Sequence, residues 1–113
     1  MTKIRLFTLL ICLSCNAFAG LSISDFEDKN KVQSTNSYIK GLSGGLNTMN
    51  RELAAGDTVP LFCLPPYLNL TTANYREIIA LGVKELAPNV IPRPDIDQIL
   101  LNQLITLYPC GYN

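Results

Sequence analysis

Apolar residues recur three or four positions apart in three segments of the chain, which is the spacing of one face of a helix. The first segment covers roughly residues 32–54. The second begins after Thr71 or Thr72 and ends before Pro88. The third follows Asp95, a favourable helix N-cap, and runs almost to the C-terminus. The positions predicted to face inward are Ile39, Leu42, Leu46, Met49, Leu53, Tyr75, Ile78, Ile79, Val83, Leu86, Ile96, Ile99, Leu100, Gln103, Leu104 and Leu107. No segment alternates convincingly between apolar and polar residues, so the predicted fold is an all-α bundle of three to four helices.

Prolines mark the connections between these helices. Residues 59–66 are apolar but include three prolines, and proline lacks the N–H that a helix interior or a central strand needs. We therefore expect an extended, buried connector there. Residues 87–95 also contain three prolines, which predicts a stiff loop. Residues 20–31 are mostly polar, and we expect a partly disordered lead-in to the first long helix.

The N-terminal residues have the layout of a secretory signal peptide. Lys3 and Arg5 form a basic start, and residues 6–15 form an apolar run. The motif Ala-Phe-Ala at residues 17–19 supplies a small-residue cleavage site. We expect cleavage after Ala19, which leaves one exported domain of residues 20–113.

Two other interpretations of the N-terminal segment stay open. The apolar run could form an anchoring or buried helix, although it is shorter than the roughly 20 residues that cross a bilayer. Alternatively, Cys15 could carry a lipid. Cys12 stands where a lipoprotein signal has an aliphatic residue, which argues against lipidation.

Two cysteines, Cys63 and Cys110, remain after cleavage. An even pair in an exported protein predicts one disulfide, here between the start of the second helix and the end of the third. The alternative is a reactive thiol, which needs a nearby group to stabilise its thiolate. The chain contains no His to take that role.

Charge and composition exclude several classes of function. Nine basic residues balance nine acidic ones, so the chain lacks the basic surface typical of nucleic-acid binding. Without His there is no Ser-His-Asp or Cys-His pair and no imidazole metal ligand. We therefore expect no enzymatic activity, no cofactor, no nucleic-acid partner and, after signal cleavage, no membrane association.

Three glycines, Gly41, Gly44 and Gly45, lie inside the first long helix, where each costs about 1 kcal/mol relative to Ala. Gly41 and Gly45 share a face because they are four positions apart. They leave a flat patch that another backbone can approach. The patch predicts a helix–helix contact, either within the chain or across a homodimer.

Several short motifs occur in a fixed order over residues 36–110. They are Tyr38-Ile39-Lys40-Gly41-Leu42, Gly45-Leu46, Phe62-Cys63-Leu64-Pro65, Ala87-Pro88, Arg93-Pro94 and Leu107-Tyr108-Pro109-Cys110. Their order and spacing resemble the Rap/Tai family of bacterial periplasmic immunity proteins. Many members carry a further cysteine just before the first motif, and residues 34–37 contain none. A second disulfide is therefore not expected.

The resemblance implies a periplasmic immunity protein that binds a Tae-type peptidoglycan amidase delivered by type VI secretion. Such a protein blocks the active-site groove of the amidase, and members of the family tend to form homodimers. Our candidate for the blocking element is the stiff loop 87–95. Its candidate effector-binding residues are Asn89, Val90, Ile91, Arg93 and Asp95. The alternative is that the loop only connects two helices, with Val90 and Ile91 packed inward.

A different class of function stays open. Small periplasmic acid-stress chaperones are also short helical proteins with one disulfide, and their apolar dimer surfaces open at low pH. The order of the proline-containing motifs favours the immunity family.

Overall fold

The computed structural model describes residues 20–111, and the predicted signal peptide 1–19, with Cys12 and Cys15, lies outside them. The helices are α2 (Ile23–Glu27), the 3-10 helix η2 (Lys29–Lys31), α3 (Val32–Ala55), α4 (Thr72–Glu85) and α5 (Ile96–Leu107). The described part of the chain contains no strand, so the predicted all-α class is confirmed. None of its helices has both the length and the apolar character that a membrane span requires.

Local capping explains why the last two helices start where they do. The Thr71 side chain accepts a hydrogen bond from the N–H of Asn74, whose side chain accepts one from Thr71 N–H, a reciprocal capping box. Asp95 accepts from the N–H of Gln98 at the start of α5. Both starting positions were predicted, and α4 ends three residues before Pro88, as expected.

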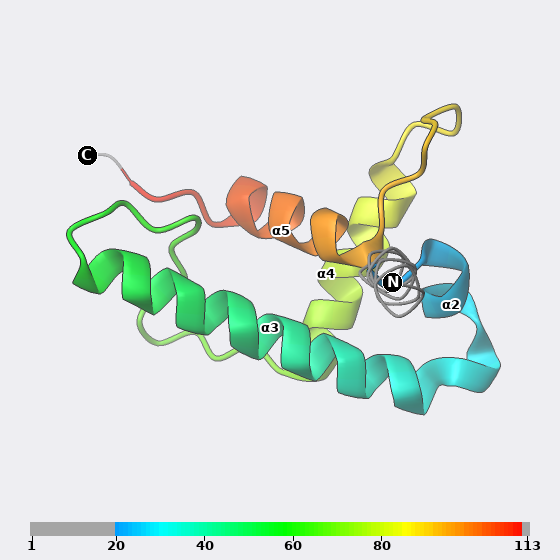
Figure 1. Cartoon of the computed structure of the whole chain (residues 1–113), viewed down its shortest axis with the longest axis horizontal. Coiled ribbons are helices and arrows are strands. Elements are labelled where there is room, and N and C mark those ends of the chain that lie inside the picture. The colour runs from blue at the N-terminus through cyan, green and yellow to red at the C-terminus, as the bar shows by residue number, and fades with distance from the viewer. Residues whose placement is uncertain (1–19, 112–113) are drawn as a thin grey trace, which may run out of the picture.

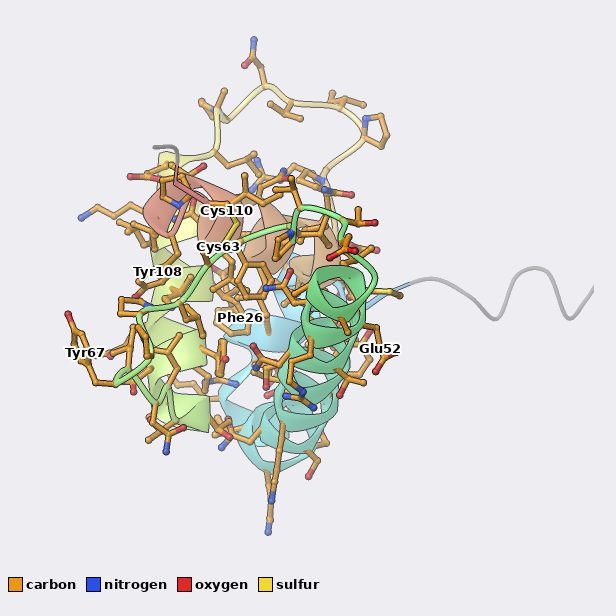
Figure 2. The ribbon with its side chains drawn as sticks, turned by 90° about the vertical axis from the view of Figure 1, so that its left-hand side faces the viewer. Phe26, Glu52, Cys63, Tyr67, Tyr108 and Cys110 are labelled. Carbon is orange, nitrogen blue, oxygen red and sulfur yellow. A yellow bond between two sulfur atoms is a disulfide. The ribbon has the colours of Figure 1, made fainter. Side chains whose placement is uncertain are left out.

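α4 stands at the centre of the fold, because α3 and α5 both pack against it (Figure 1). The core residues come from the three long helices, α2 and the connector before α4, and they meet in the space between the helices (Figure 2). They are Phe26, Ile39, Phe62, Tyr75, Ile79, Ile96, Ile99, Leu100 and Leu104. Most of these positions lie on the three predicted apolar stripes.

Two residues predicted to face inward lie on the surface instead. Met49 is 57% exposed and Leu107 is 43% exposed. The buried stripe of α3 passes through Ile39 and Ser43 and continues at half-buried Asn50 rather than at Met49. The prediction was wrong because hydrophobic spacing does not show which side of a helix its neighbours cover.

The segment predicted as a partly disordered lead-in is folded, and that prediction was wrong. α2 buries Phe26, and the guanidinium of Arg76 lies 4.5 Å from the centre of its ring. Arg76 also donates hydrogen bonds to the Phe26 carbonyl at 3.2 Å and to the Thr35 hydroxyl at 3.0 Å. A cation over an aromatic face, together with these hydrogen bonds, fixes α2 on α4 and α3.

Gly82 permits a close approach of α4 and α5. A Cβ at this position would lie 2.6 Å from Cγ2 of Ile99 and 2.8 Å from Cγ of Gln103. Both atoms lie close to the backbone of α5, so these side chains or one of the two helices would have to shift. The sequence patterns did not single out Gly82.

We expect Gly82→Ala to lower the free energy of unfolding by about 1–2 kcal/mol, because the overpacking outweighs the gain in helix propensity. Gly44→Ala is the matched control. A Cβ on Gly44 meets no atom within 4 Å, so this change should raise stability by up to about 1 kcal/mol. Urea denaturation measures both variants. Equal shifts in the two proteins would contradict the close α4–α5 contact.

Candidate functional site

The loop of residues 87–95 projects from the helices between α4 and α5, as Figure 1 shows in yellow to orange. Ile91 is 89% exposed, so it does not pack inward as the alternative interpretation required. Asn89 and Arg93 are exposed as well, whereas Val90 is half-buried and donates its N–H to the Ala87 carbonyl at 3.3 Å. The loop therefore presents one large apolar side chain beside polar ones.

The exit of the loop is fastened to the first residues of the described chain. Ile96 donates its N–H to the Leu21 carbonyl at 2.7 Å, and Leu21 donates its own to Oδ1 of Asp97 at 3.1 Å. Asp95, the last residue of the loop, is at the same time the N-cap of α5. These bonds hold the C-terminal arm of the loop in one place.

Tyr38 on α3 reaches the same region and donates its hydroxyl to Oδ2 of Asp97 at 2.7 Å. Partial burial, followed by the hydrogen bond and the negative charge of Asp97, raises the pKa of Tyr38 to about 12. The hydroxyl therefore keeps its proton, and its role as a donor, throughout the physiological pH range.

A cleft of about 570 Å³ lies against the C-terminal arm of the loop. Its lining residues are Gly20, Ser22, Ile23, Ser24, Glu27, Arg93, Pro94 and Asp95. The structure thus brings two predicted site residues, Arg93 and Asp95, together with α2. Asn89, Val90 and Ile91 do not line this cleft. The sequence did not predict that α2 lines this cleft, because residues 20–31 are mostly polar and were expected to be partly disordered.

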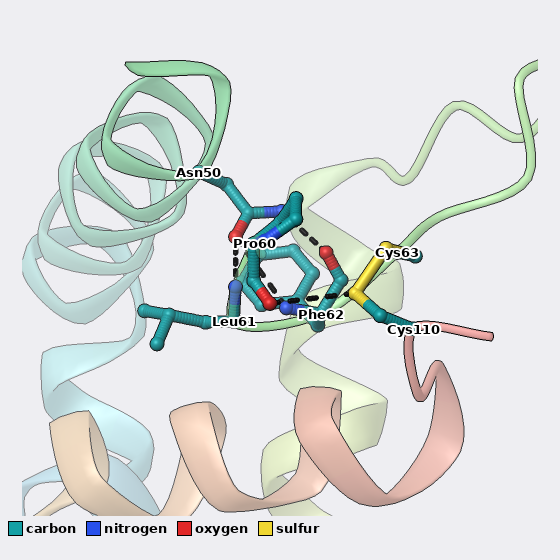
Figure 3. Close-up of a disulfide and its surroundings, with 6 residues drawn as sticks. All are labelled: Asn50, Pro60, Leu61, Phe62, Cys63 and Cys110. Atoms are coloured by element: carbon teal, nitrogen blue, oxygen red, sulfur yellow. Dashed lines mark hydrogen bonds between the residues drawn. A yellow bond between two sulfur atoms is a disulfide. The ribbon is translucent and has the colours of Figure 1, made fainter. Parts of the chain in front are cut away.

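The disulfide between Cys63 and Cys110 is formed as predicted, with 4.8 Å between the two Cα atoms. Figure 3 shows its surroundings, in which Pro60 O lies 3.4 Å from Sγ of Cys110. Cys63 N–H donates to the Tyr108 carbonyl at 2.8 Å, which adds a second link between the connector and the C-terminal segment.

Asn50 on α3 holds the same connector from the other side (Figure 3). Its Oδ1 accepts from the N–H of Leu61 at 2.7 Å and of Phe62 at 3.4 Å, and its Nδ2 donates to the Phe62 carbonyl. Residues 59–66 form neither a helix nor a strand, and the connector is less buried than expected, because Leu61 is 40% and Val59 73% exposed. Sequence reasoning gave Asn50 no role.

The predicted contact residues Gly41 and Gly45 lie on an exposed face of α3. A Cβ at either position would meet no atom within 4 Å among the residues described. The expectation of a helix contact within the chain was therefore wrong. A contact between two copies of the chain stays a prediction.

The ionisable side chains of residues 20–111 form one ion pair and no candidate metal site. This part of the chain holds no group of three or more His, Cys, Asp or Glu side chains placed to bind a metal ion. Its one ion pair joins Lys31 to Asp25 at 2.8 Å, and both side chains are exposed. The hydrogen bond between them lowers the pKa of Asp25 and raises that of Lys31. An exposed pair of this kind contributes little to stability.

Comparisons with known proteins find no matching family model, no matching curated protein and no matching solved structure.

Proposed function

We propose that this protein is a periplasmic immunity protein of the Rap/Tai type, which binds and inhibits a Tae-type peptidoglycan amidase delivered by type VI secretion. The observation that carries the proposal is the projecting loop 87–95 with Ile91 89% exposed at its surface. The resemblance of the motifs over residues 36–110 supplies the class of partner.

The physics of binding favours such a loop as the blocking element. An amidase must hold an extended peptide in a groove, and a narrow loop has the width to fill that groove. Three prolines restrict the backbone of loop 87–95, and Asp95 fixes one end by capping α5. Less conformational entropy is therefore lost when the loop is immobilised by a partner.

The side chains of the loop suit the centre and the rim of a protein interface. A single apolar anchor that enters a pocket commonly provides much of the binding energy, and Ile91 is the anchor we propose. Asn89 and Arg93 offer polar contacts around it, and Asp95 and half-buried Val90 support the loop. The protein thus acts by occupying the groove, without catalysis and without a cofactor.

We further propose that the protein is a homodimer. Gly41 and Gly45 leave the exposed face of α3 flat, which allows the backbone of a second copy to come close.

The Cys63–Cys110 disulfide suits the oxidising periplasm to which the signal peptide would direct the chain.

A protection assay in bacteria tests the function. A Tae-type amidase directed to the periplasm lyses the cells that make it. We expect co-expression of the full chain to prevent lysis, and deletion of residues 89–93 to abolish protection without preventing accumulation of the protein. Lysis despite accumulated wild-type protein, with every amidase tried, would contradict the proposal. Prevention of client aggregation near pH 2–3 would then support the acid-stress chaperone.

A further inference from the structure

The first residue of the expected mature domain is packed against two carboxylates. A Cβ on Gly20 would collide with Oδ2 of Asp95 and Oδ1 of Asp97. The backbone bonds that Leu21 makes with Ile96 and Asp97 hold Gly20 in this position. Any larger residue here would force the side chains of Asp95 and Asp97 to shift. The nitrogen of Gly20 is bonded to the same Cα as that Cβ would be, so it also lies near both carboxylates.

The two carboxylates share one small region without a cationic partner. Oδ1 of Asp95 accepts from Gln98 N–H, and Oδ2 of Asp97 accepts from the Tyr38 hydroxyl. Among the residues described, neither Asp95 nor Asp97 forms an ion pair with a lysine or an arginine. The N-terminus of α5 favours their negative charges. However, both carboxylates lie next to Gly20, and their like charges repel each other.

We propose that signal cleavage after Ala19 supplies the missing cation: the new α-ammonium group of Gly20 pairs with Asp95 and Asp97 and locks the start of α5. In the uncleaved chain the same nitrogen is an uncharged amide. Cleavage hydrolyses the Ala19–Gly20 peptide bond with one water molecule and releases the signal peptide as a carboxylate. Processing would thereby add, after export, a charged contact to the backbone bonds that already fasten the exit of loop 87–95.

The other charges around Gly20 do not cancel this pairing. Glu27 of α2 and Arg93 of the loop line the same cleft, and Tyr38 of α3 stays neutral below its raised pKa. Three carboxylates therefore oppose one guanidinium, so the amine pKa should rise above its ordinary value of about 8. A raised pKa means that the stabilisation is complete below about pH 7.7 and disappears as the pH rises through the folded-state value.

The test uses the full chain, expressed with its own signal and purified from the periplasm. N-terminal sequencing should give Gly20 as the first residue. An NMR titration of its Hα resonance should give an amine pKa above about 8. A chain with one glycine inserted before Gly20 moves the ammonium away, and we expect it to unfold at lower urea than the wild type at pH 7 but not at pH 10.

Asp95→Asn sharpens the test, because asparagine keeps the N-cap and removes the charge. It should bring the amine pKa back toward its ordinary value, whereas Glu52→Gln, an exposed carboxylate at the far end of α3, should leave it raised (Figure 2). An ordinary pKa in the wild type, another N-terminal residue, or equal stability with the inserted glycine at pH 7 would each overturn the inference. These readouts do not depend on amidase inhibition, so their failure leaves the proposed function untouched.

Discussion

Replacing both Cys63 and Cys110 with serine should lower the free energy of unfolding by about 4 kcal/mol, the value expected for a cross-link that closes a loop of this length. The two cysteines are 47 positions apart in the sequence. Small domains are stabilised by only about 5–15 kcal/mol in total, so the loss of this cross-link would remove a large share of the stability.

The expected loss of stability comes from the missing cross-link and not from lost packing of the two side chains. Cys63 is exposed and Cys110 is half-buried, so replacing sulfur with oxygen removes little buried apolar surface. The cross-link acts on the unfolded chain, whose freedom it restricts. Urea denaturation of the oxidised wild type, the reduced wild type and the double variant measures it. The last two should agree within about 1 kcal/mol, and a double variant as stable as the oxidised protein would contradict the prediction.

Replacing Ile91 with arginine should weaken inhibition of the cognate amidase at least about 30-fold, the loss typical of a buried anchor residue. In the free protein Ile91 is 89% exposed, so the fold loses no buried contact when it is changed. Urea denaturation of the variant should therefore match that of the wild type. The loss arises in the complex, where a charged side chain would have to enter an apolar pocket.

Tyr67→Arg is the matched control for this experiment. Tyr67 is 88% exposed, on the connection between α3 and α4, and its side chain points away from the helices (Figure 2). The same change of charge at nearly the same exposure should leave inhibition intact. Inhibition retained by the Ile91 variant, or lost equally in both, would show that loop 87–95 is not the blocking element.

Features of the fold that depend on neighbouring residues in the sequence were predictable. Helix α3 was expected at residues 32–54 and spans Val32–Ala55. The prediction succeeded because the apolar residues recur at helical spacing along this segment and Gly56 follows it. The caps at Thr71 and Asp95 were expected because a side-chain oxygen three residues before a backbone N–H needs no distant partner. The Cys63–Cys110 pairing followed from counting cysteines after signal removal.

Features that depend on distant parts of the chain were not predictable in the same way. Phe26 is a single aromatic residue in a polar segment, and Arg76, which lies over its ring, is 50 positions away in the sequence. Asn50 is a polar residue on the inner side of α3. Its role is to hydrogen-bond the backbone of Phe62, which is distant in the sequence. Gly82 allows α4 to pack closely on α5, and this role depends on the position of Ile99, 17 residues later in the chain.

The candidate site was predictable as a segment but not as a surface. Its prolines indicated a stiff loop, whereas the exposure of Ile91 depends on whether any helix covers the loop, which the sequence does not show. The cleft between Arg93 and α2 depends on the folding of a segment that had been expected to be partly disordered.

The most direct test of the central claim is an inhibition assay with the oxidised, processed protein and a panel of Tae-type amidases acting on peptidoglycan fragments. The account predicts that one amidase is inhibited at a one-to-one ratio of chains while the others remain active. Full activity of every amidase at excess protein, with the disulfide intact, would contradict it.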